Sequence, residues 1–267
     1  METRPRRKGA AGPKYSKGAG AHDEARSGSI FGGTLANTDA RLPDPIVPPS
    51  EALISRLAPL GPVPGRADLS AYQAPDVFAL WQAWEAETGK RQDIPYWATV
   101  WPAALMTIRF LGENPGAVAG KSVLDFGCGC GIAGIAALKA GAARALANDI
   151  DPIALWMAER NASANGLGSP GGVRLETAPG NLLEAPPSPD WGVLLVADLF
   201  YEKPVAERML AWLAQARRNG SAVFIADASR PFGPKTGVQV LSEGKYATDT
   251  DLEGSSERLV RLLAYLP

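Results

Sequence analysis

The chain has 267 residues, of which 46% are hydrophobic and 21% are charged, and its formal net charge at pH 7 is −1. These values are typical of a soluble globular protein with one large α/β domain and a tail, and the balanced charge gives no electrostatic argument for binding nucleic acid or a membrane. No apolar stretch approaches the roughly 18–20 residues that a membrane-spanning helix needs.

The histidine and cysteine content excludes several kinds of chemistry. His22 is the one histidine and lies near the N-terminus, so we expect no Ser-His-Asp or Cys-His mechanism in the folded domain. Cys128 and Cys130 are too close in sequence to cross-link distant segments, and two ligands do not make a zinc site. We therefore expect no metal, and nothing in the cysteine content requires an oxidising compartment.

Residues 1–49 are predicted to form a disordered tail, because Gly, Ala, Pro, Ser and Arg dominate and no apolar periodicity appears. The first twenty residues are basic, so a transit peptide is an alternative, although Gly and Pro would break the helix that such a peptide needs. We predict a cytoplasmic protein, with the mitochondrial matrix as the alternative, in which residues 50–267 form the folded domain.

The domain is predicted to begin with a helical and aromatic segment, residues 50–115. Its expected elements are a strand or helical turn at 50–57, a short strand at 69–71, and helices at 76–85 and 102–111. Tyr96, Trp97 and Trp101 cluster just before the last of these helices. Aromatic residues at this density either pack in the core or, from this position, form a wall over the ligand-binding end of the sheet.

A short apolar run that ends on Asp125 is followed by glycines at alternate positions and then by helix formers at 132–140. This order predicts a strand, a tight loop and a helix. The glycines are Gly127, Gly129 and Gly131. Glycine permits positive φ angles and lets a ligand lie against bare backbone, and the helix N-terminus offers unpaired N–H groups. Such a turn binds a nucleotide-like ligand in doubly wound sheets; a structural turn without a ligand is the alternative.

A second predicted strand leads to Asp149, and the next helix follows from Asp151 and Pro152. Asp before Pro at the start of a helix is typical of an N-cap with proline in the first turn, so we assign Asp151 to capping. Asp149 lies about 20 residues after the glycine loop, which is the distance expected of an acid that accepts hydrogen bonds from the hydroxyls of a ribose.

The remaining segments continue the alternation of buried strands and helices. We expect strands at 173–177, 191–197 and 221–226, a helix at 204–218, and paired strands near 238–241 and 258–266. Asn181 follows the third strand, where its amide either reads the edge of an adenine or belongs to an ordinary turn. The alternation predicts an α/β three-layer sandwich.

Four motifs occur in the order and at the spacing of a known superfamily. They are Pro95-Tyr96-Trp97-Ala98…Trp101-Pro102, Gly120-Lys121-Ser122-Val123-Leu124-Asp125, Ala147-Asn148-Asp149-Ile150-Asp151-Pro152 and Asp198-Leu199-Phe200-Tyr201. With them, residues from about 50 to 267 resemble the class I S-adenosylmethionine (AdoMet) methyltransferases, and within these the lysine methyltransferases of the electron-transfer-flavoprotein β-subunit type. The resemblance implies a seven-stranded, mostly parallel Rossmann-like sheet with an antiparallel last strand. Where many relatives carry Gly-Gly after Trp-Pro, this chain has Ala103-Ala104, a difference that concerns the shape of the pocket.

The resemblance also implies AdoMet as the methyl donor and a set of site residues. Those expected to bind the cofactor are Asp125, Gly127 and Gly129 at its methionine end, Asp149 at the ribose, Asn181 at the adenine, and Trp101. Those expected at the incoming amine are Asp198 and Tyr201 as catalytic residues, with Trp97 and Phe200 as walls of the substrate pocket.

The implied function is methylation of a protein lysine, on the electron-transfer flavoprotein β-subunit or a ribosomal protein, with no nucleic acid or membrane as a partner. The oligomeric state stays open. The attacking lysine must be neutral, and with a free pKa near 10.4 its deprotonation at pH 7 costs roughly 4.6 kcal/mol. Apolar walls and the neighbouring sulfonium lower that pKa, whereas Asp198 attracts the ammonium. We therefore assign Asp198 to docking and alignment.

Three other functions are compatible with the same fold. A small-molecule N-methyltransferase of the nicotinamide type would have a small closed pocket, and a non-catalytic AdoMet- or nucleotide-binding module would bind without turnover. A nucleic-acid methyltransferase is supported only by the basic tail, because the folded part lacks an Asn-Pro-Pro-Tyr type motif.

Overall fold

The structure, a computed structural model, describes residues 47–168 and 174–266. These residues belong to one structural unit, Pro45–Pro267. The predicted tail lies outside the described residues except for its last three positions, so the tail and the location argued from it stay predictions. Within the described ranges, no helix combines the length and the apolar character that crossing a bilayer takes.

Helices and strands alternate along most of the chain. The strands are β1 (Leu60–Val63), β2 (Arg66–Tyr72), β3 (Ser122–Phe126), β4 (Arg144–Asp149), β5 (Leu175–Pro179), β6 (Val193–Ala197), β7 (Ala222–Asp227), β8 (Val238–Ala247) and β9 (Glu257–Tyr265). The α-helices are α1 (Glu51–Leu57), α2 (Val77–Thr88), α3 (Pro102–Glu113), α4 (Ile132–Lys139), α5 (Pro152–Ala164), α6 (Lys203–Arg218) and α7 (Thr250–Glu253). The short 3-10 helices are η1 (Tyr96–Ala98), η2 (Pro115–Ala117) and η3 (Leu182–Glu184).

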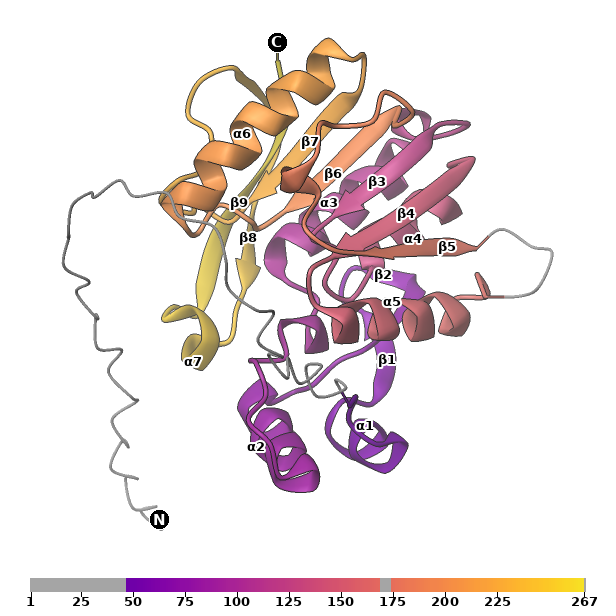
Figure 1. The fold of residues 1–267 in the computed structure, drawn as a ribbon, viewed down its shortest axis with the longest axis vertical. Helices are drawn as coiled ribbons and strands as arrows, with labels where there is room; N and C mark the ends of the chain where they lie inside the picture. Colours follow the sequence, from indigo (N-terminus) through magenta and orange to yellow (C-terminus); the bar gives the residue numbers. More distant parts are fainter. Residues whose placement is uncertain (1–46, 169–173, 267) are drawn as a thin grey trace, which may run out of the picture. The chain divides into compact units, whose positions relative to one another are not determined.

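A seven-stranded sheet with the order β5-β4-β3-β6-β7-β9-β8 forms the middle layer. The five strands β3 to β7 run parallel to one another, and β9 is antiparallel to both of its neighbours, β7 and β8. Helices α3, α4 and α5 contribute to the hydrophobic cluster on one face and α6 to that on the other, and Figure 1 shows α6 in front of the sheet with α3 and α4 behind it. The predicted three-layer sandwich with an antiparallel last strand is confirmed.

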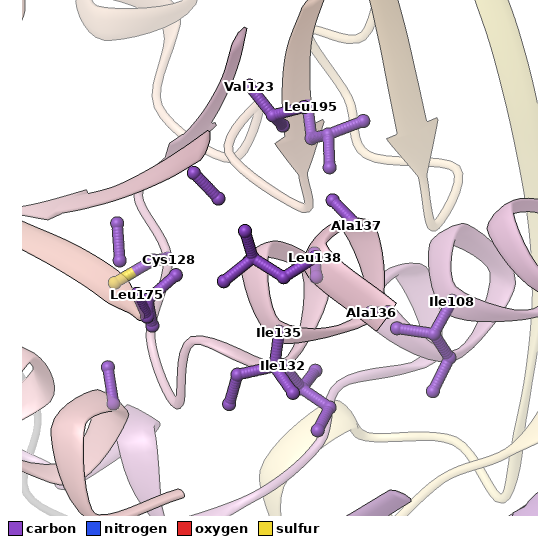
Figure 2. Packing of buried hydrophobic residues seen from close by; sticks show 14 of the residues in the cluster. Ile108, Val123, Cys128, Ile132, Ile135, Ala136, Ala137, Leu138, Leu175 and Leu195 are labelled. Carbon is purple, nitrogen blue, oxygen red and sulfur yellow. The ribbon is translucent and has the colours of Figure 1, made fainter. Parts of the chain in front are cut away.

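Strand β3 shows how the two apolar layers are built. Successive side chains of a strand point to opposite faces, so Val123 belongs to the cluster with α4, whereas Leu124 and Phe126 belong to the cluster with α6. Residues 132–138 of α4 are all buried, which is why this helix has no polar stripe. Figure 2 shows side chains of α4 packed near Val123 and Leu195. This packing fixes the end of β3 and the start of α4, and therefore the loop between them.

Strands β1 and β2 form a separate antiparallel sheet that the sequence predicts only in part, because the expected strand 69–71 lies within β2 and β1 is not expected. Gly65 in the connecting turn has a φ of 75°, the left-handed conformation that tight hairpins need. The edge of β2 is attached to α5 by Asn165, whose amide oxygen accepts from the N–H of Ser70 at 3.0 Å and whose amide nitrogen donates to the carbonyl of Ser70 at 2.7 Å. The hairpin is thus seated on the helix that follows Asp149.

Element boundaries agree with the expectation in the centre of the domain and shift at its ends. The segment 50–57 is the helix α1, capped by Ser50, whose hydroxyl accepts from the N–H of Leu53. Strand β5 is Leu175–Pro179, and residue 173, where this strand is expected to begin, lies outside the described residues. Strand β8 is longer than expected, because it pairs with β9 along most of its length.

Candidate active site

The carboxyl ends of the parallel strands bring most of the predicted site residues to one edge of the sheet. The loop 127–131 follows β3, Asp149 ends β4, and Asp198 follows β6. Strand β3 lies between β4 and β6, so the order reverses there, and ligands bind at such a switch point. The two loops touch, because a Cβ on Gly127 would lie 2.5 Å from Cδ1 of Leu199.

The glycine loop is left-handed at each of its three glycines. Gly127, Gly129 and Gly131 have φ angles of 64°, 51° and 74°, a conformation that side chains rarely adopt. A Cβ on Gly131 would lie 2.6 Å from that of Ala158, whereas a Cβ on Gly129 would have nothing within 4 Å. Gly129 therefore combines a backbone conformation that favours glycine with open space in front of it, as a ligand lying against bare backbone requires.

Asp149 joins the glycine loop to the start of α5. Its Oδ2 accepts from the N–H of Gly129 at 2.9 Å, and its Oδ1 accepts from the N–H of Asp151 at 3.0 Å. Burial raises the pKa of Asp149, and the backbone hydrogen bonds oppose this. Asp151 caps α5 by accepting from the N–H of Ile153 at 2.8 Å, which confirms the capping assignment. Each oxygen of Asp149 keeps a lone pair, so the ribose assignment stays a prediction that the geometry allows.

Asp125 faces the interior of the fold. Its side chain is almost fully buried, and Oδ2 accepts from the N–H of Gly134 in α4 at 2.8 Å. Burial raises the pKa of Asp125 to about 7, and the charge of Asp149 adds to the increase. This carboxyl group thus ties the end of β3 to the first turn of α4. Its predicted contact with the methionine end of a cofactor stays a prediction.

The adenine assignment also stays a prediction. Asn181 is exposed after β5, and its side chain accepts from the N–H of Leu183 at 3.1 Å, which makes it the cap of η3.

Ile150, next to Asp149, exposes 75% of its surface, unlike most large apolar residues of the domain. Asn148, which the sequence does not single out, is buried and donates to the carbonyls of Ala178 and Gly180, both at 2.9 Å.

Asn161 on α5 is a second residue that sequence reasoning misses. It is fully buried, its amide nitrogen donates to the carbonyl of Cys130 at 2.9 Å, and its amide oxygen accepts from the N–H of Tyr72 at 2.8 Å. It therefore connects the glycine loop to β2. The available signal is its place on the buried stripe of α5, seven residues after Ala154, where a polar side chain needs partners.

Two of the aromatic residues expected to wall the pocket lie in the core instead. Trp97 is 1% exposed and packs edge-on against Trp84, with ring centroids 6.0 Å apart. Phe200 is fully buried in the cluster under α6. Both rings are buried because each packs in a cluster of apolar side chains.

Trp101 lies nearer the surface than these two residues. Its indole N–H donates to the carbonyl of Tyr96 at 2.8 Å, and the two rings are 5.9 Å apart. Trp101 and Pro102 line a small cavity of about 70 Å³ together with Thr248 and Glu253. Trp101 thus remains available as a wall residue, on the side of the domain where α7 lies.

Asp198 is held by an arginine. Its φ is 63°, its N–H donates to the carbonyl of Ala226 at 3.0 Å, and its carboxylate accepts from Nε and Nη2 of Arg230 at 2.7 and 2.5 Å. The same guanidinium donates to Glu253 on α7. The sequence places Asp198 at a strand end but gives no sign of this pairing, because Arg230 is 32 residues away.

Tyr201 lies within electrostatic reach of both halves of the site. It exposes 57% of its surface. Partial burial of the phenol raises the pKa of Tyr201, and the negative charges of Glu202, Asp149 and Asp198 add to this. Asp149 ends β4, and Asp198 and Tyr201 follow β6, so the three residues lie at the same edge of the sheet.

The two cysteines of the loop are buried and unreactive. Cys128 and Cys130 are 9% and 4% exposed and form no disulfide. Burial raises the pKa of Cys128 well above its ordinary value and that of Cys130 to about 12. Both groups are therefore thiols, and only the thiolate is nucleophilic.

Comparison with known proteins gives consistent similarities. Residues 102–185 match the family described as ribosomal protein L11 methyltransferase (PrmA). The electron transfer flavoprotein beta subunit lysine methyltransferase of Xenopus laevis is 39% identical over 137 residues, which are 51% of this chain and 53% of the relative. The human protein of the same name is 39% identical over 138 residues, 51% of this chain and 50% of the relative. The chain thus spans about half the length of these relatives.

A shorter stretch resembles a different methyltransferase. The ribosomal protein L11 methyltransferase of Aeromonas hydrophila is 60% identical over 50 residues, which are 19% of this chain and 17% of that protein.

Proposed function

We propose that the chain is a class I, seven-β-strand AdoMet-dependent methyltransferase that transfers a methyl group from AdoMet to lysine side chains of a protein. One observation carries the proposal. The open backbone at Gly129, tied to Asp149, lies at the same edge of the sheet as Asp198 and Tyr201. This placement supports a donor site next to an acceptor site at the switch point.

The donor half of the site fits AdoMet. The glycine loop leaves room at Gly129, Asp149 offers two carboxylate oxygens with lone pairs to spare, and Ile150 offers an exposed apolar surface. AdoMet supplies a methyl group on a positively charged sulfonium. The task of these residues is to hold the donor so that its methyl group faces the acceptor half within about 3–3.5 Å of the incoming nitrogen.

The acceptor half must position a neutral amine. The carboxylate of Asp198 accepts a hydrogen bond from the lysine nitrogen, and Tyr201, three residues later in the same loop, has an exposed ring. The proton leaves to water, because both oxygens of Asp198 are already engaged by Arg230. Trp101 offers an aromatic face to a lysine that has already received a methyl group.

The names of the most similar relatives support the electron-transfer flavoprotein β-subunit as the substrate. A ribosomal protein is the second candidate, because the family match over residues 102–185 and the Aeromonas hydrophila relative both bear the name of a ribosomal protein L11 methyltransferase.

The proposal is tested by incubating the protein with AdoMet labelled on its methyl group and, separately, with purified flavoprotein β-subunit, ribosomal protein L11 or nicotinamide. We expect label on a lysine of one of the two proteins, located by mass spectrometry of peptides. Label on nicotinamide alone would favour a small-molecule methyltransferase. Binding of AdoMet by calorimetry with no transfer to any acceptor would favour a non-catalytic module.

A further inference from the structure

An ion-pair network links four separate segments next to the acceptor half of the site. Arg230, between β7 and β8, donates to Asp198 after β6, at 2.7 and 2.5 Å, and to Glu253 of α7, at 3.0 and 2.6 Å. Glu253 in turn accepts from Nε of Arg258 on β9 at 3.0 Å. The side chains of Asp198, Glu253 and Arg230 are 8%, 3% and 17% exposed. Three segments thus meet at one guanidinium.

The backbone is strained at both ends of the Asp198–Arg230 pair. Among the described residues, the non-glycine positions with positive φ are Asp198, at 63°, and Ser229, at 60°, next to Arg230. Such conformations persist only where the surrounding structure determines them, and they concentrate at functional sites. The bidentate pair and the hydrogen bond from the N–H of Asp198 to Ala226 provide that constraint. The direction of the Asp198 carboxylate is therefore set by Arg230.

The charges balance among the ion-paired side chains, and Asp227 is a further carboxylate beside Arg230. Asp198 and Glu253 carry two negative charges, and Arg230 and Arg258 carry two positive charges. An unpaired carboxylate beside a substrate lysine would stabilise the ammonium form, which has no lone pair for the methyl group. A carboxylate that already has a counter-ion exerts little of this effect, yet its oxygens keep lone pairs that accept a hydrogen bond from a neutral amine.

We propose that Arg230 is a positioning and specificity-determining residue of this methyl transfer, which fixes the direction of Asp198 and cancels its charge so that the site takes an amine rather than an ammonium. This inference rests on the proposed function. It predicts that the pH profile of methyl transfer moves in opposite directions when a positive charge and when a negative charge is removed from the network. Removing a positive charge stabilises the substrate ammonium, and removing a negative charge destabilises it.

The other ionisable groups around the pair stay constant in the comparison. They are Asp227 on β7, Arg258 on β9, Glu202 and Tyr201 after β6, and Asp149 at the end of β4. Each is present in the wild type and in all variants. Burial raises the pKa of Asp227 and the Arg230 guanidinium lowers it, so the response of Asp227 is part of the shift measured in Arg230→Gln.

The test is the pH profile of kcat/KM for the protein substrate at saturating AdoMet, with AdoMet affinity measured by calorimetry. In Arg230→Gln the ascending limb should move to higher pH by about one unit or more, which is about tenfold in rate at pH 7. In Glu253→Gln it should move to lower pH. Arg230→Lys, which keeps the charge but not the fork of two donors, should keep the wild-type limb with a lower kcat. AdoMet affinity should stay unchanged in all three.

Arg261→Gln is the matched control, because Arg261 pairs with Glu243 in an exposed ion pair and is outside the network; its profile should equal that of the wild type. Active variants with unmoved profiles, or Arg230→Gln and Glu253→Gln shifting in the same direction, would overturn the role of Arg230. If Arg230→Gln does not fold, the role of Arg230 is tested by two other results. These are the direction in which the pH profile of Glu253→Gln moves and the position of the ascending limb of the pH profile of Arg230→Lys. A wild type that methylates no protein lysine at any pH overturns the proposed function, and this inference with it.

Discussion

Asp149 is the residue through which the loop and the donor site are coupled, since its two oxygens hold the N–H groups of Gly129 and Asp151. We predict that Asp149→Ala weakens AdoMet binding by at least about tenfold, because it removes both the ribose acceptor and the tie to the loop, and one such hydrogen bond to a charged group contributes about 1.5–3 kcal/mol. Calorimetric titration with AdoMet measures this.

Asp190→Ala is the matched control for that titration. Asp190 is an exposed aspartate just before β6, so it lies at the amino end of the strands, away from the edge that carries the site. Its removal should leave AdoMet affinity as in the wild type. Equal affinities for all three proteins would remove Asp149 from the donor site.

Asp125 gives a prediction about pH. Its pKa is about 7 in the folded protein, against an ordinary value of 3.8, so the folded state binds this proton more tightly than the unfolded state. Between about pH 4 and 7 the free energy of unfolding therefore loses a contribution as pH rises. Asp125→Asn removes that loss, because the neutral amide oxygen can still accept from Gly134. The difference between the Tm of the variant and the Tm of the wild type should therefore increase from pH 4 to pH 8. A difference that stays constant over this range would contradict the burial of the Asp125 carboxylate.

The sequence predicts single residues well where their role is local. Asp151 is recognisable as a cap because the proline that follows it starts the helix, and the structure confirms it. For Trp97 the sequence leaves core and pocket wall open, and for Phe200 it gives no sign of the core, since the burial of both depends on which layers close over them. The partner of Asp198 cannot be read from sequence either, because the fold alone brings it to Arg230.

Among the elements, one side chain of α5, Asn161, contacts both the glycine loop and β2. Asn161→Ala would leave the carbonyl of Cys130 and the N–H of Tyr72 without their partner in a buried place. An unsatisfied buried group costs about 1–3 kcal/mol, so we expect a loss of about 2–4 kcal/mol in the free energy of unfolding by urea titration. Asn165→Ala, one turn later and only partly buried, should cost less. Equal losses would mean that burial at Asn161 does not set the cost.

The central strands are predictable because they are buried on both faces and read as apolar runs. Strand β1 is missed because its sequence, Leu60-Gly61-Pro62-Val63, contains two residues that are rare in strands. Strand β8 is underestimated because its second half is polar and alternates in burial. Its pairing with β9, rather than its own apolar content, carries it to Ala247.

At the scale of the whole molecule, the reversal of strand order between β4-β3 and β6 places the donor and acceptor residues on neighbouring loops. A ligand that binds there stabilises the entire domain. AdoMet at about 100 times its Kd should raise the free energy of unfolding by about 2.7 kcal/mol, which for a domain of this size is a Tm increase of about 5–10 °C. Differential scanning fluorimetry measures this. NAD at the same concentration is the control, and a larger shift with NAD than with AdoMet would contradict the choice of cofactor.

The buried thiols have a practical consequence for timing the loop's motion. The chain contains two cysteines, and both lie between glycines in the loop after β3. A thiol-specific reagent can modify them only in molecules whose loop has opened, so the rate of modification reports the frequency of that opening. No engineered label is required, and a bound methyl donor that closes the loop would slow the colour change of an ordinary thiol assay.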